Sequence, residues 1–434
     1  MRDGLRETIA WFRNRADLGV KAGDSVASQT NVEVDRRRHK VAVIGTGYVG
    51  AVTSTCLAFL GHSVCGLDID PVRAGQLNDG QVPFHEPGLP ELLLETLRTG
   101  RLRFTDRPAE ALADADFVFF LCVGTPPGSD GAPDLAQLES AIQSLAPHLR
   151  SDAVIVNKST VPVGSGNWTR TILEDALEGN RQLSFHVVSN PEFLREGSAI
   201  ADFIYPDRIV LGGNASDVSR VAELYRPVLD QSFEGGRRGR RPTLITTELA
   251  SAEMIKYAAN AFLATKISFA NEMAQLCELF GADVREVLPA IGADHRVGNA
   301  FLNPPGVGWG GSCFGKDVSA LISSGEEYGY LPSMLQATVE INKMQRARTV
   351  RKLQRELHIF LKGRRIALFG LTFKPGTDDL RDAPALDIAR RLLSAGAVVS
   401  AFDPVVKKLC PRNSERFGSR ETFTRRLTGW MPLS

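Results

Sequence analysis

Cys313 stands at the end of a segment whose composition suits a reactive thiol. Four glycines precede it in Gly306-Val-Gly-Trp-Gly-Gly-Ser-Cys313, and a helix is expected to begin at this cysteine. Backbone amides and the positive end of a helix favour the thiolate, which is the nucleophilic form of cysteine. A cysteine is more commonly a small buried apolar residue. We assign that role to Cys56, Cys65, Cys122 and Cys277, but burial does not explain the four glycines before Cys313.

Two polar residues on a predicted helix, and one acid after the cysteine, are candidates to assist the thiol. Residues 248–280 contain no Gly or Pro, so we expect one helix of about 50 Å there. Lys256 and Asn260 are four residues apart and therefore share a face of this helix. An isolated lysine more often reaches solvent, although a lysine on an apolar face needs a partner. Asp317 follows Cys313 by one turn, and alone it would be interpreted as a solvated helix residue.

The segment Gly45-Thr46-Gly47-Tyr48-Val49-Gly50 has the spacing of a dinucleotide-binding turn. A strand precedes it and an apolar helix follows, which is the context that separates this motif from an ordinary tight turn. The helix N-terminus offers amides to a pyrophosphate. Asp68 ends the next predicted strand, where its carboxylate accepts ribose hydroxyls and repels a 2′-phosphate. The expected cofactor is therefore NAD rather than NADP.

A further cluster of charge follows another predicted strand, in Asn190-Pro-Glu192-Phe-Leu-Arg195-Glu196-Gly197. Ligands of open α/β sheets bind at the carboxyl ends of strands. Two carboxylates and a guanidinium at such an end are candidates for ligand contact, and the alternative is that they are solvated surface charges.

Strand-like runs that alternate with helical segments must position these residues. The runs cover 41–44, 63–67, 117–123, 153–157, 186–188 and 209–211. This alternation predicts an α/β fold with a mainly parallel, doubly wound sheet. We divide the chain into a poorly ordered extension at 1–39, a Rossmann-like NAD-binding domain at 40–242, a central helical and dimerisation domain at 243–362, and a second Rossmann-like domain at 363–434.

A weak internal repeat supports the second Rossmann-like domain. Residues 40–45 match residues 365–370, and in each copy a later glycine precedes an aspartate by seven residues. These aspartates are Asp68 and Asp403. The second copy lacks the three-glycine turn, so we expect it to bind something other than a dinucleotide or only to pack. After Pro404 the periodicity fails, and this predicts a truncated C-terminal domain.

Composition excludes several classes of protein. Lys plus Arg total 51 against 50 Asp plus Glu, and this balance gives no field to attract nucleic acid or a membrane. No apolar run approaches the ~20 residues of a membrane helix, and residues 1–40 contain no signal-peptide core. The cysteines and histidines form neither a CxxC pair nor an HExxH motif, so no metal site is expected. We expect a cytoplasmic protein with free thiols.

Five ordered motifs resemble the UDP-glucose/GDP-mannose dehydrogenase family, and within it the UDP-glucose branch. The motifs are Gly45–Gly50, Lys158-Ser-Thr160-Val-Pro-Val-Gly164, Asn190–Glu196, Gly310-Gly-Ser-Cys-Phe-Gly-Lys-Asp317 and Phe373-Lys-Pro-Gly-Thr-Asp-Asp-Leu-Arg381. They lie between residues 40 and 405. The resemblance implies an NAD-linked four-electron oxidation of the C6 alcohol of UDP-glucose to the carboxylate of UDP-glucuronate, without a metal.

The resemblance also implies a role for each matching residue. Cys313 would be the nucleophile that holds the aldehyde as a thiohemiacetal and then as a thioester. Lys256, Asn260 and Asp317 would surround the reacting oxygen, and Glu192 with Thr160 would activate water. The implied cofactor contacts are Gly45, Thr46, Gly47, Tyr48, Val49, Gly50, Asp68, Arg73, Thr125, Thr160, Glu196, Lys316 and Arg381. The implied contacts with the nucleotide sugar are Glu192, Phe193, Leu194, Arg195, Lys256, Asn260, Arg296, Asn303, Gly306, Trp309, Gly310, Phe373 and Lys374.

Partners and alternatives follow from the same comparison. In the family, Arg296 reaches the site of a neighbouring subunit, so a homodimer or a larger homo-oligomer is implied. One alternative is a related nucleotide-sugar dehydrogenase that takes GDP-mannose. Another is a simple Rossmann alcohol or hydroxyacid dehydrogenase, which needs no cysteine. The last is an NAD-binding or interaction protein with little turnover, because a shortened C-terminal domain would not close on a nucleotide sugar.

Overall fold

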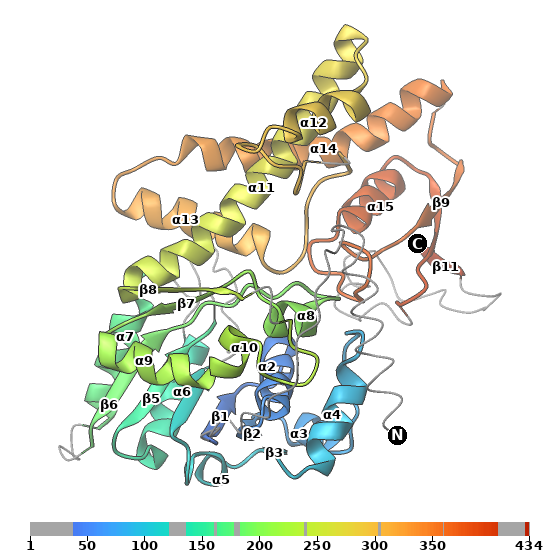
Figure 1. Ribbon diagram of the computed structural model, residues 1–434. Coiled ribbons are helices and arrows are strands. Elements are labelled where there is room, and N and C mark those ends of the chain that lie inside the picture. Colours follow the sequence, from blue (N-terminus) through green and yellow to red (C-terminus); the bar gives the residue numbers. More distant parts are fainter. Residues whose placement is uncertain are drawn as a thin grey trace, which may run out of the picture. The chain divides into compact units, whose positions relative to one another are not determined.

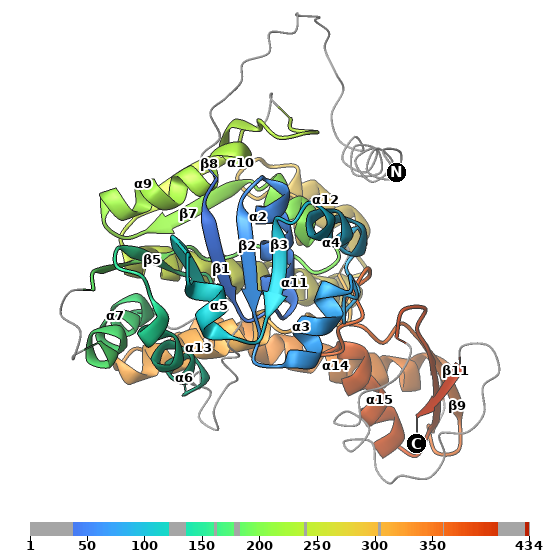
Figure 2. The same ribbon diagram turned by 90° about the horizontal axis from the view of Figure 1, so that it is seen from below.

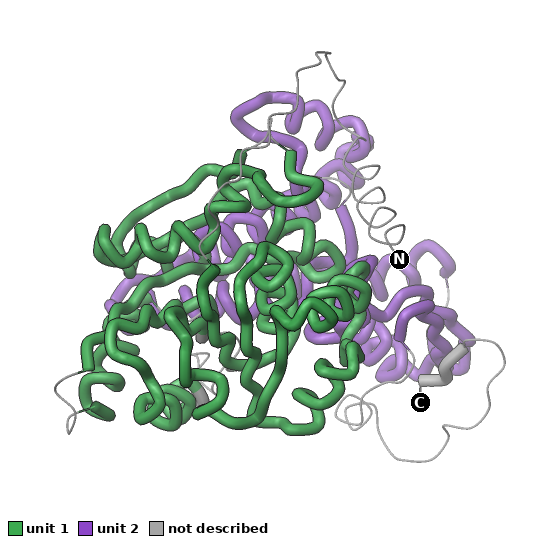
Figure 3. The backbone as a smooth tube through the Cα atoms, turned by 60° about the horizontal axis from the view of Figure 1, so that its bottom comes forward, with its two compact units in different colours: residues 1–125, 134–256 green, residues 126–133, 257–434 purple. Residues whose placement is uncertain are grey.

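The computed structural model describes residues 38–120, 136–159, 163–177, 183–237, 241–302, 305–358, 360–406 and 430–433. The chain divides into two compact units (Figure 3). Unit 1 comprises residues 1–125 and 134–256, and unit 2 comprises residues 126–133 and 257–434. The division into four parts made from the sequence stays a prediction, and its extension at 1–39 lies almost entirely outside the described residues.

Unit 1 alternates strands and helices along most of its length (Figure 1). Its elements are β1 (Lys40–Ile44), α2 (Tyr48–Phe59), β2 (Ser63–Leu67), α3 (Pro71–Asn78), α4 (Leu89–Arg98), β3 (Leu102–Thr105), α5 (Pro108–Leu112), β4 (Phe117–Phe120), α6 (Ala136–Leu145), η1 (Ala146–His148), β5 (Ala153–Asn157), α7 (Ser165–Ala176), β6 (Phe185–Ser189), α8 (Ala199–Ile204), β7 (Arg208–Gly212), α9 (Ala215–Leu224), α10 (Arg226–Asp230), β8 (Thr243–Thr247) and the start of α11 (Leu249–Phe280).

The strands of unit 1 form one eight-stranded sheet in the order β3-β2-β1-β4-β5-β6-β7-β8. Neighbouring strands are parallel except for β6 and β7, which meet antiparallel at Ser189 and Gly212. The predicted mainly parallel α/β fold is therefore confirmed, as are the predicted strands where the structure describes them. Strands β3 and β8 were not predicted from the sequence, because β3 has only four residues and β8 is rich in threonine.

Helices cover both faces of this sheet (Figure 2). On one face α2, α4, α8, α9 and α10 pack against strand residues such as Val41 and Val43. On the other face α5, α6 and α7 pack against Ala42 and Ile44. Successive side chains of β1 thus enter opposite cores, as the two-residue period of a strand requires. Burial on both faces explains why the predicted strands are continuous apolar runs rather than alternating ones.

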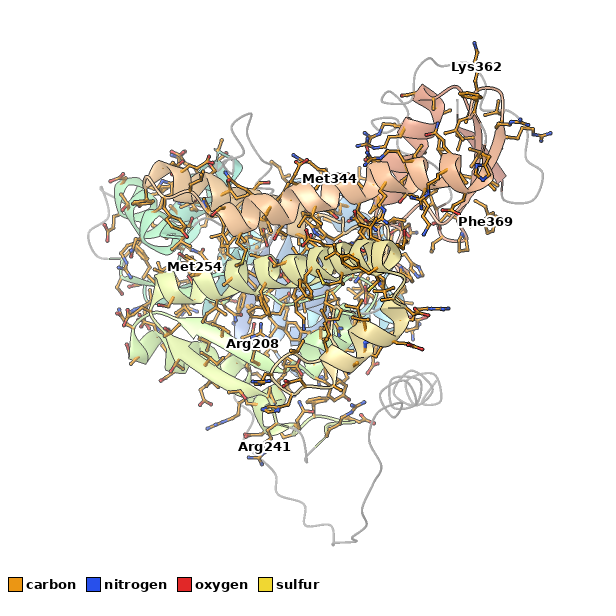
Figure 4. The ribbon with its side chains drawn as sticks, turned by 90° about the horizontal axis from the view of Figure 1, so that it is seen from above. Arg208, Arg241, Met254, Met344, Lys362 and Phe369 are labelled. Carbon is orange, nitrogen blue, oxygen red and sulfur yellow. The ribbon has the colours of Figure 1, made fainter. Side chains whose placement is uncertain are left out.

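Unit 2 begins with the remainder of α11 and contains a helical region followed by a small sheet. Its other elements are α12 (Val284–Gly292), α13 (Phe314–Glu327), α14 (Ser333–Leu357), β9 (Arg365–Phe369), α15 (Pro384–Ser394), β10 (Val398–Phe402) and β11 (Trp430–Leu433). The helix predicted over residues 248–280 is confirmed as α11. Helices α11 and α14 lie side by side, and Ser268 Oγ donates to the carbonyl of Thr338 at 2.9 Å (Figure 4).

The small sheet has the order β11-β10-β9, with β9 and β10 parallel and β11 antiparallel to β10. Helix α15 packs against it through Leu386, Ala389 and Leu392. The predicted loss of pattern after Pro404 falls mainly on residues 407–429, which lie outside the described residues. Nowhere in the described part of the chain is a helix both long enough and apolar enough to cross a bilayer.

The internal repeat is visible in the backbone of the two units. Gly45 and Gly370 both have positive φ, at 81° and 87°, which is the region that glycine adopts readily. The N–H of Gly45 donates to Leu67 O, and the N–H of Gly370 donates to Phe402 O, each at 2.8 Å. The first strand, the turn and the neighbouring strand therefore have equivalent hydrogen bonds in the two units. Each unit contains a Rossmann-like start.

The two repeated aspartates each accept four hydrogen bonds but differ in how these are distributed over the two carboxylate oxygens. In unit 1 the N–H of Thr46 donates to Asp68 at 2.9 Å, and in unit 2 the N–H of Leu371 donates to Asp403 at 2.8 Å. Asp403 accepts three further backbone N–H groups, those of Thr372, Val405 and Val406. Four backbone donors occupy both of its oxygens. Asp403 therefore stabilises its own turn through both oxygens, whereas Oδ1 of Asp68 accepts only the amide of Asp70 among the described residues.

The first turn of α2 gives a test of this packing. A Cβ at Gly50 would lie 1.9 Å from Gly45 O, so Gly50→Ala must displace the backbone of the turn. We expect the free energy of unfolding to fall by about 1–3 kcal/mol or more. Urea unfolding measures this change. Gly75→Ala is the matched control, because its Cβ would meet no atom within 4 Å in α3, and a stability gain of up to about 1 kcal/mol is expected there. Equal losses in both variants would contradict the argument.

Candidate active site

The turn between β1 and α2 has the form that a dinucleotide pyrophosphate requires. Gly47 is the N-cap of α2, and no side chain caps the helix there. The first amides of α2 are thus available to an anion, which the helix dipole also favours. Because Gly50 has no Cβ, α2 approaches the carbonyl of Gly45 closely. Val49 packs against the core of unit 1. These residues fit NAD, which accepts a hydride when it is bound.

Asp68 lies at the end of β2 and is 5% exposed. Burial acts to raise the pKa of its carboxyl, but N–H groups of Asp70 and Thr46, the Thr46 hydroxyl and Arg73 outweigh burial and hold the pKa below its usual value. The carboxylate is therefore ionised. Thr46 and Arg73 contact Oδ2, whereas Oδ1 accepts the Asp70 amide at 3.1 Å. This leaves acceptor capacity on Oδ1 for a ribose hydroxyl, as the sequence predicts for NAD.

Tyr48 connects the turn to the segment that contains Glu196. Its hydroxyl hydrogen-bonds to the buried carboxyl of Glu86, which also accepts the N–H groups of Gly197 at 2.6 Å and Ala199 at 2.8 Å. Burial raises the pKa of Glu86. Glu86 was not predicted from the sequence, because a single acid in the loop before α4 has no spacing pattern that would single it out.

Glu192 and Lys256 form a buried ion pair in unit 1. Glu192 Oε1 lies 2.9 Å from Lys256 Nζ, and Oε2 accepts the N–H of Leu194 at 2.6 Å. Burial acts to raise the pKa of Glu192, but the charge and hydrogen bond of Lys256 outweigh it, so the pKa lies below its ordinary value of 4.5. Two cations contact the ring of Phe193: its centroid is 5.5 Å from Lys256 Nζ and 4.1 Å from the Arg208 guanidinium. Glu192 is thus a carboxylate, as water activation requires.

Lys158 is a second buried cation that favours ionised Glu192. It follows β5, and its Nζ donates to Asn190 Oδ1 at 3.2 Å and lies 5.8 Å from the ring centroids of Phe203 and Tyr225. Lys158 belongs to the motif Lys158–Gly164, but no role was predicted for it from the sequence. A lysine directly after a fully buried strand is the signal that would have indicated it.

Cys313 begins the region of unit 2 that is suited to covalent chemistry. It is the N-cap of α13, which confirms the predicted start of a helix, and its Sγ lies 3.5 Å from Ser312 Oγ. Cys313 is half-buried, whereas Cys56, Cys65 and Cys277 are buried. Burial raises the pKa of the Cys65 thiol to about 11 and also raises that of Cys56, so both stay protonated. Cys122 lies outside the described residues.

Asp317 and Asn260 form a buried polar pair one turn after Cys313. Asp317 is fully buried, and its Oδ2 accepts Asn260 Nδ2 at 2.6 Å. Lys316 Nζ lies 3.3 Å from Oδ1. The hydrogen bond to Asp317 fixes the orientation of the Asn260 amide. The nearby Lys316 ammonium offsets part of the cost of burying the carboxylate. The structure therefore joins three of the predicted residues in one cluster.

The comparisons with known proteins identify the family. Three parts of the UDP-glucose/GDP-mannose dehydrogenase family match in order: the NAD binding domain at residues 39–229, the central domain at 250–344 and the UDP binding domain at 367–428. The chain belongs to this family. The predictions of the family and of NAD as cofactor are confirmed, and the chain is an NAD-dependent nucleotide-sugar dehydrogenase.

Individual relatives of this dehydrogenase are similar over most of their length. UDP-glucose 6-dehydrogenase TuaD of Bacillus subtilis is 45% identical over 366 residues, which cover 84% of this chain and 76% of the relative. UDP-glucose 6-dehydrogenase of Pseudomonas aeruginosa is 44% identical over 84% of this chain and 79% of its own length. A solved UDP-glucose dehydrogenase from Pyrobaculum islandicum has a TM-score of 0.79 and 37% identity, covering 86% of this chain and 84% of that one.

The other residues assigned to the nucleotide-sugar dehydrogenase site lie in several settings. Trp309 is buried in the helical core, where its indole N–H donates to Ser268 Oγ at 3.0 Å, and Leu194 packs against the core of unit 1. The N–H of Gly306 donates to Asn271 at 2.8 Å. Exposed arginines pair with nearby acids: Arg195 with Asp202, Arg296 with Asp294 and Arg381 with Asp379. Lys374 lies over the ring of Phe373. The predicted residues Thr125, Thr160 and Asn303 lie outside the described residues.

Replacing Lys256 by methionine should destabilise this dehydrogenase in a pH-dependent manner. At pH 7 the variant leaves ionised Glu192 without its main partner, and we expect a loss of about 3 kcal/mol, since Lys158 remains. The lowered pKa of Glu192 stabilises the native protein above pH 4.5, and this contribution is lost as the pH falls below that value. Without Lys256 the pKa of Glu192 rises, so the variant gains stability relative to the native protein as the pH falls from 7 to 5.

Urea unfolding at pH 7 and pH 5 measures this difference between the two proteins. Lys266→Met on the same helix is the control, because Lys266 is half-buried and donates to the backbone carbonyls of Val297 and Gly298. A gap between Lys256→Met and the native protein that stays constant with pH would contradict the assignment of the ion pair.

Proposed function

We propose that this dehydrogenase oxidises UDP-glucose to UDP-glucuronate and reduces two NAD molecules per sugar. The observation that carries the proposal is a half-buried cysteine at the N-cap of α13, with the buried Asp317–Asn260 pair one turn later. A thiol is what an enzyme needs to retain an aldehyde between two oxidations, whereas a single-step alcohol dehydrogenase does not require one. The identity with UDP-glucose 6-dehydrogenases supports the choice of sugar.

In the proposed first oxidation, the C6 alcohol loses a proton and a hydride and becomes an aldehyde. The Cys313 thiolate adds to the aldehyde carbon, and the oxygen becomes the oxyanion of a thiohemiacetal. Lys256 and Asn260 stabilise negative charge on the oxygen by their N–H groups. The tether from Asn260 to Asp317 holds that amide in place before the reaction, so no reorganisation is needed when charge develops.

In the second oxidation, the thiohemiacetal loses a hydride and becomes a thioester. Water then attacks the thioester carbon, the carbon–sulfur bond breaks, and the thiolate of Cys313 leaves. Glu192 accepts the proton of the water, together with Thr160. The low pKa of Glu192 fits this role, because a base must be ionised before it accepts a proton. The sum is one alcohol, one water and two NAD giving one carboxylate, two NADH and three protons.

GDP-mannose is the second candidate substrate, since a GDP-mannose dehydrogenase of known structure is 33% identical with a TM-score of 0.54. Its identity is lower than that of the UDP-glucose dehydrogenases, and this favours UDP-glucose. We also propose a cytoplasmic location, because the described cysteines are free thiols, as is usual in a reducing compartment.

We propose that the protein assembles as a homodimer through α11. Phe262, Phe269 and Leu276 are spaced seven residues apart and therefore share a face, yet they are 64%, 42% and 38% exposed. An apolar stripe of this kind is typical of an interaction surface. Phe262→Glu combined with Phe269→Glu should produce a monomer in sedimentation velocity, whereas the native protein should sediment as a dimer or larger. An unchanged sedimentation coefficient in the double variant would contradict the proposal.

The stoichiometry of the reaction tests the proposed activity. With limiting UDP-glucose and excess NAD, two NADH should form per sugar consumed, because both oxidations use the same cofactor. Absorbance at the NADH band measures the ratio. One NADH per sugar would replace the proposal by a simple alcohol dehydrogenase. Calorimetric titration with UDP-glucose complements the assay, since NAD binding without sugar binding would instead indicate an NAD-binding protein with little turnover.

Cys313→Ala isolates the covalent step. We expect formation of UDP-glucuronate to fall by at least 1,000-fold, while the dissociation constant of NAD stays within two-fold of the native value, because the dinucleotide turn belongs to unit 1 and Cys313 to unit 2. Chromatographic detection of the acid measures the first quantity and fluorescence titration the second. Cys277→Ala is the control, since that thiol is buried at the far end of α11. Acid formation at the native rate in Cys313→Ala would exclude the thioester route.

A further inference from the structure

The glycine-rich segment before Cys313 is held by side chains of α14. The N–H of Trp309 donates to Asn342 Oδ1 at 2.8 Å, and Asn342 Nδ2 donates back to Trp309 O at 3.0 Å. One amide side chain thus binds both backbone groups of one residue. A Cβ on Gly308 would lie 2.6 Å from Asn342 Oδ1, so this close pairing requires glycine at position 308. Asn342 therefore fixes the backbone four residues before the nucleophile.

Arg346 lies one turn after Asn342 and binds the same carbonyl. Its Nη2 donates to Trp309 O at 2.7 Å, although only 10% of the arginine side chain is exposed. The two terminal nitrogens also contact the carboxylate of Asp382, at 2.7 Å from Nη1 and 3.0 Å from Nη2. The planar guanidinium binds two partners at fixed angles, which the single ammonium of lysine does not reproduce. Arg346 therefore ties the segment before Cys313 to the segment before α15.

The backbone of these two segments is also in direct contact within unit 2. The N–H of Gly311 donates to Arg381 O at 3.0 Å, and a Cβ on Gly310 would lie 2.2 Å from Asp382 O. Gly311 has a φ of +90°, and a Cβ there would lie 2.8 Å from the ring of Phe373. Two of the four glycines before Cys313 are thus explained by the close approach of residues 373–382. Arg346 contacts both segments, through Trp309 O in one and the Asp382 carboxylate in the other.

From these contacts we infer that Asn342 and Arg346 are positioning residues that hold Cys313 in register with residues 373–382, which include the predicted sugar-nucleotide residues Phe373 and Lys374. Neither side chain is assigned a contact with substrate or cofactor. They act through the backbone of Trp309, whose position determines where the chain enters α13. The inference rests on the proposed role of Cys313 as the nucleophile.

Arg346→Lys is the principal test, because it keeps the charge and loses the planar fork. We expect kcat to fall at least ten-fold, while the dissociation constant of NAD stays within two-fold of the native value. The alkylation rate of Cys313 by iodoacetamide should change at least three-fold, measured on the Cys313 peptide by mass spectrometry with Cys313→Ala as the blank. If Arg346 had a purely structural role, the variant would have a lower melting temperature. It would not combine a lower kcat and an altered alkylation rate with an unchanged dissociation constant of NAD.

Arg348→Lys is the matched control. Arg348 lies on the same helix and pairs with Glu278, a carboxylate that Lys352 also contacts at 2.7 Å. The control keeps a cation beside Glu278 and has no contact with Trp309, so kcat and the alkylation rate should stay within two-fold of the native values. If Arg346→Lys behaves like Arg348→Lys in both measurements, the inference is wrong.

Asn342→Asp keeps the test decisive if Arg346→Lys does not fold. It is isosteric and leaves the Arg346–Asp382 pair intact, but it places a carboxylate oxygen opposite Trp309 O in place of an N–H donor. We expect the same fall in kcat and the same change in alkylation. A folded Asn342→Asp protein with native kcat and native alkylation overturns the inference. If the native protein does not oxidise UDP-glucose, the proposed function is rejected instead. The alkylation rates of Cys313 would still test whether Asn342 and Arg346 position the segment before it.

Discussion

Four buried polar side chains share one face of α11, and each of them binds a group outside that helix, in the loops that carry the chemistry. In unit 1 Glu253 accepts the N–H groups at the start of α7, and Lys256 pairs with Glu192. In unit 2 Asn260 binds Asp317, and Asn271 accepts the N–H of Gly306. An unpaired polar group at any of these buried positions costs more than its hydrogen bond contributes. One helix face therefore fixes the loops of both units, each within its own unit.

The sequence predicted those parts of the protein that depend on local pattern. Apolar runs and the uninterrupted stretch of 248–280 indicated the strands and α11, and the glycine spacing with Asp68 indicated the cofactor. Cys313 was found because glycines surround it. The partners of these residues were not predictable in the same manner. Arg346 lies in a helix with many other basic residues, and nothing local separates it from Arg348, although one is buried against Trp309 and the other pairs with Glu278. Burial is decided by packing between segments distant in sequence.

The glycines before Cys313 show that packing against distant segments can also determine which residues form a sequence motif. From the sequence they are only a flexible approach to a nucleophile, and flexibility is the property usually given to glycine. The structure gives three of them a different role, since the places of the missing Cβ atoms at Gly308, Gly310 and Gly311 are filled by Asn342, Asp382 and Phe373. A larger residue would separate these surfaces by displacing the backbone. The segment is therefore closely packed, and its glycines allow contact rather than motion.

The two copies of the Rossmann-like start share a backbone conformation, but their aspartates differ in the acceptor capacity left for a ligand. Both have a positive-φ glycine after the first strand and an aspartate that accepts the next N–H. Only the first copy also has the three-glycine turn of a dinucleotide site. Each oxygen of Asp403 accepts two backbone N–H groups, whereas at Asp68 three donors contact Oδ2 and Oδ1 accepts a single amide among the described residues. In a duplicated fold, the acceptor capacity left on a single carboxylate oxygen therefore separates the two turns in the same sense as the glycine motif does.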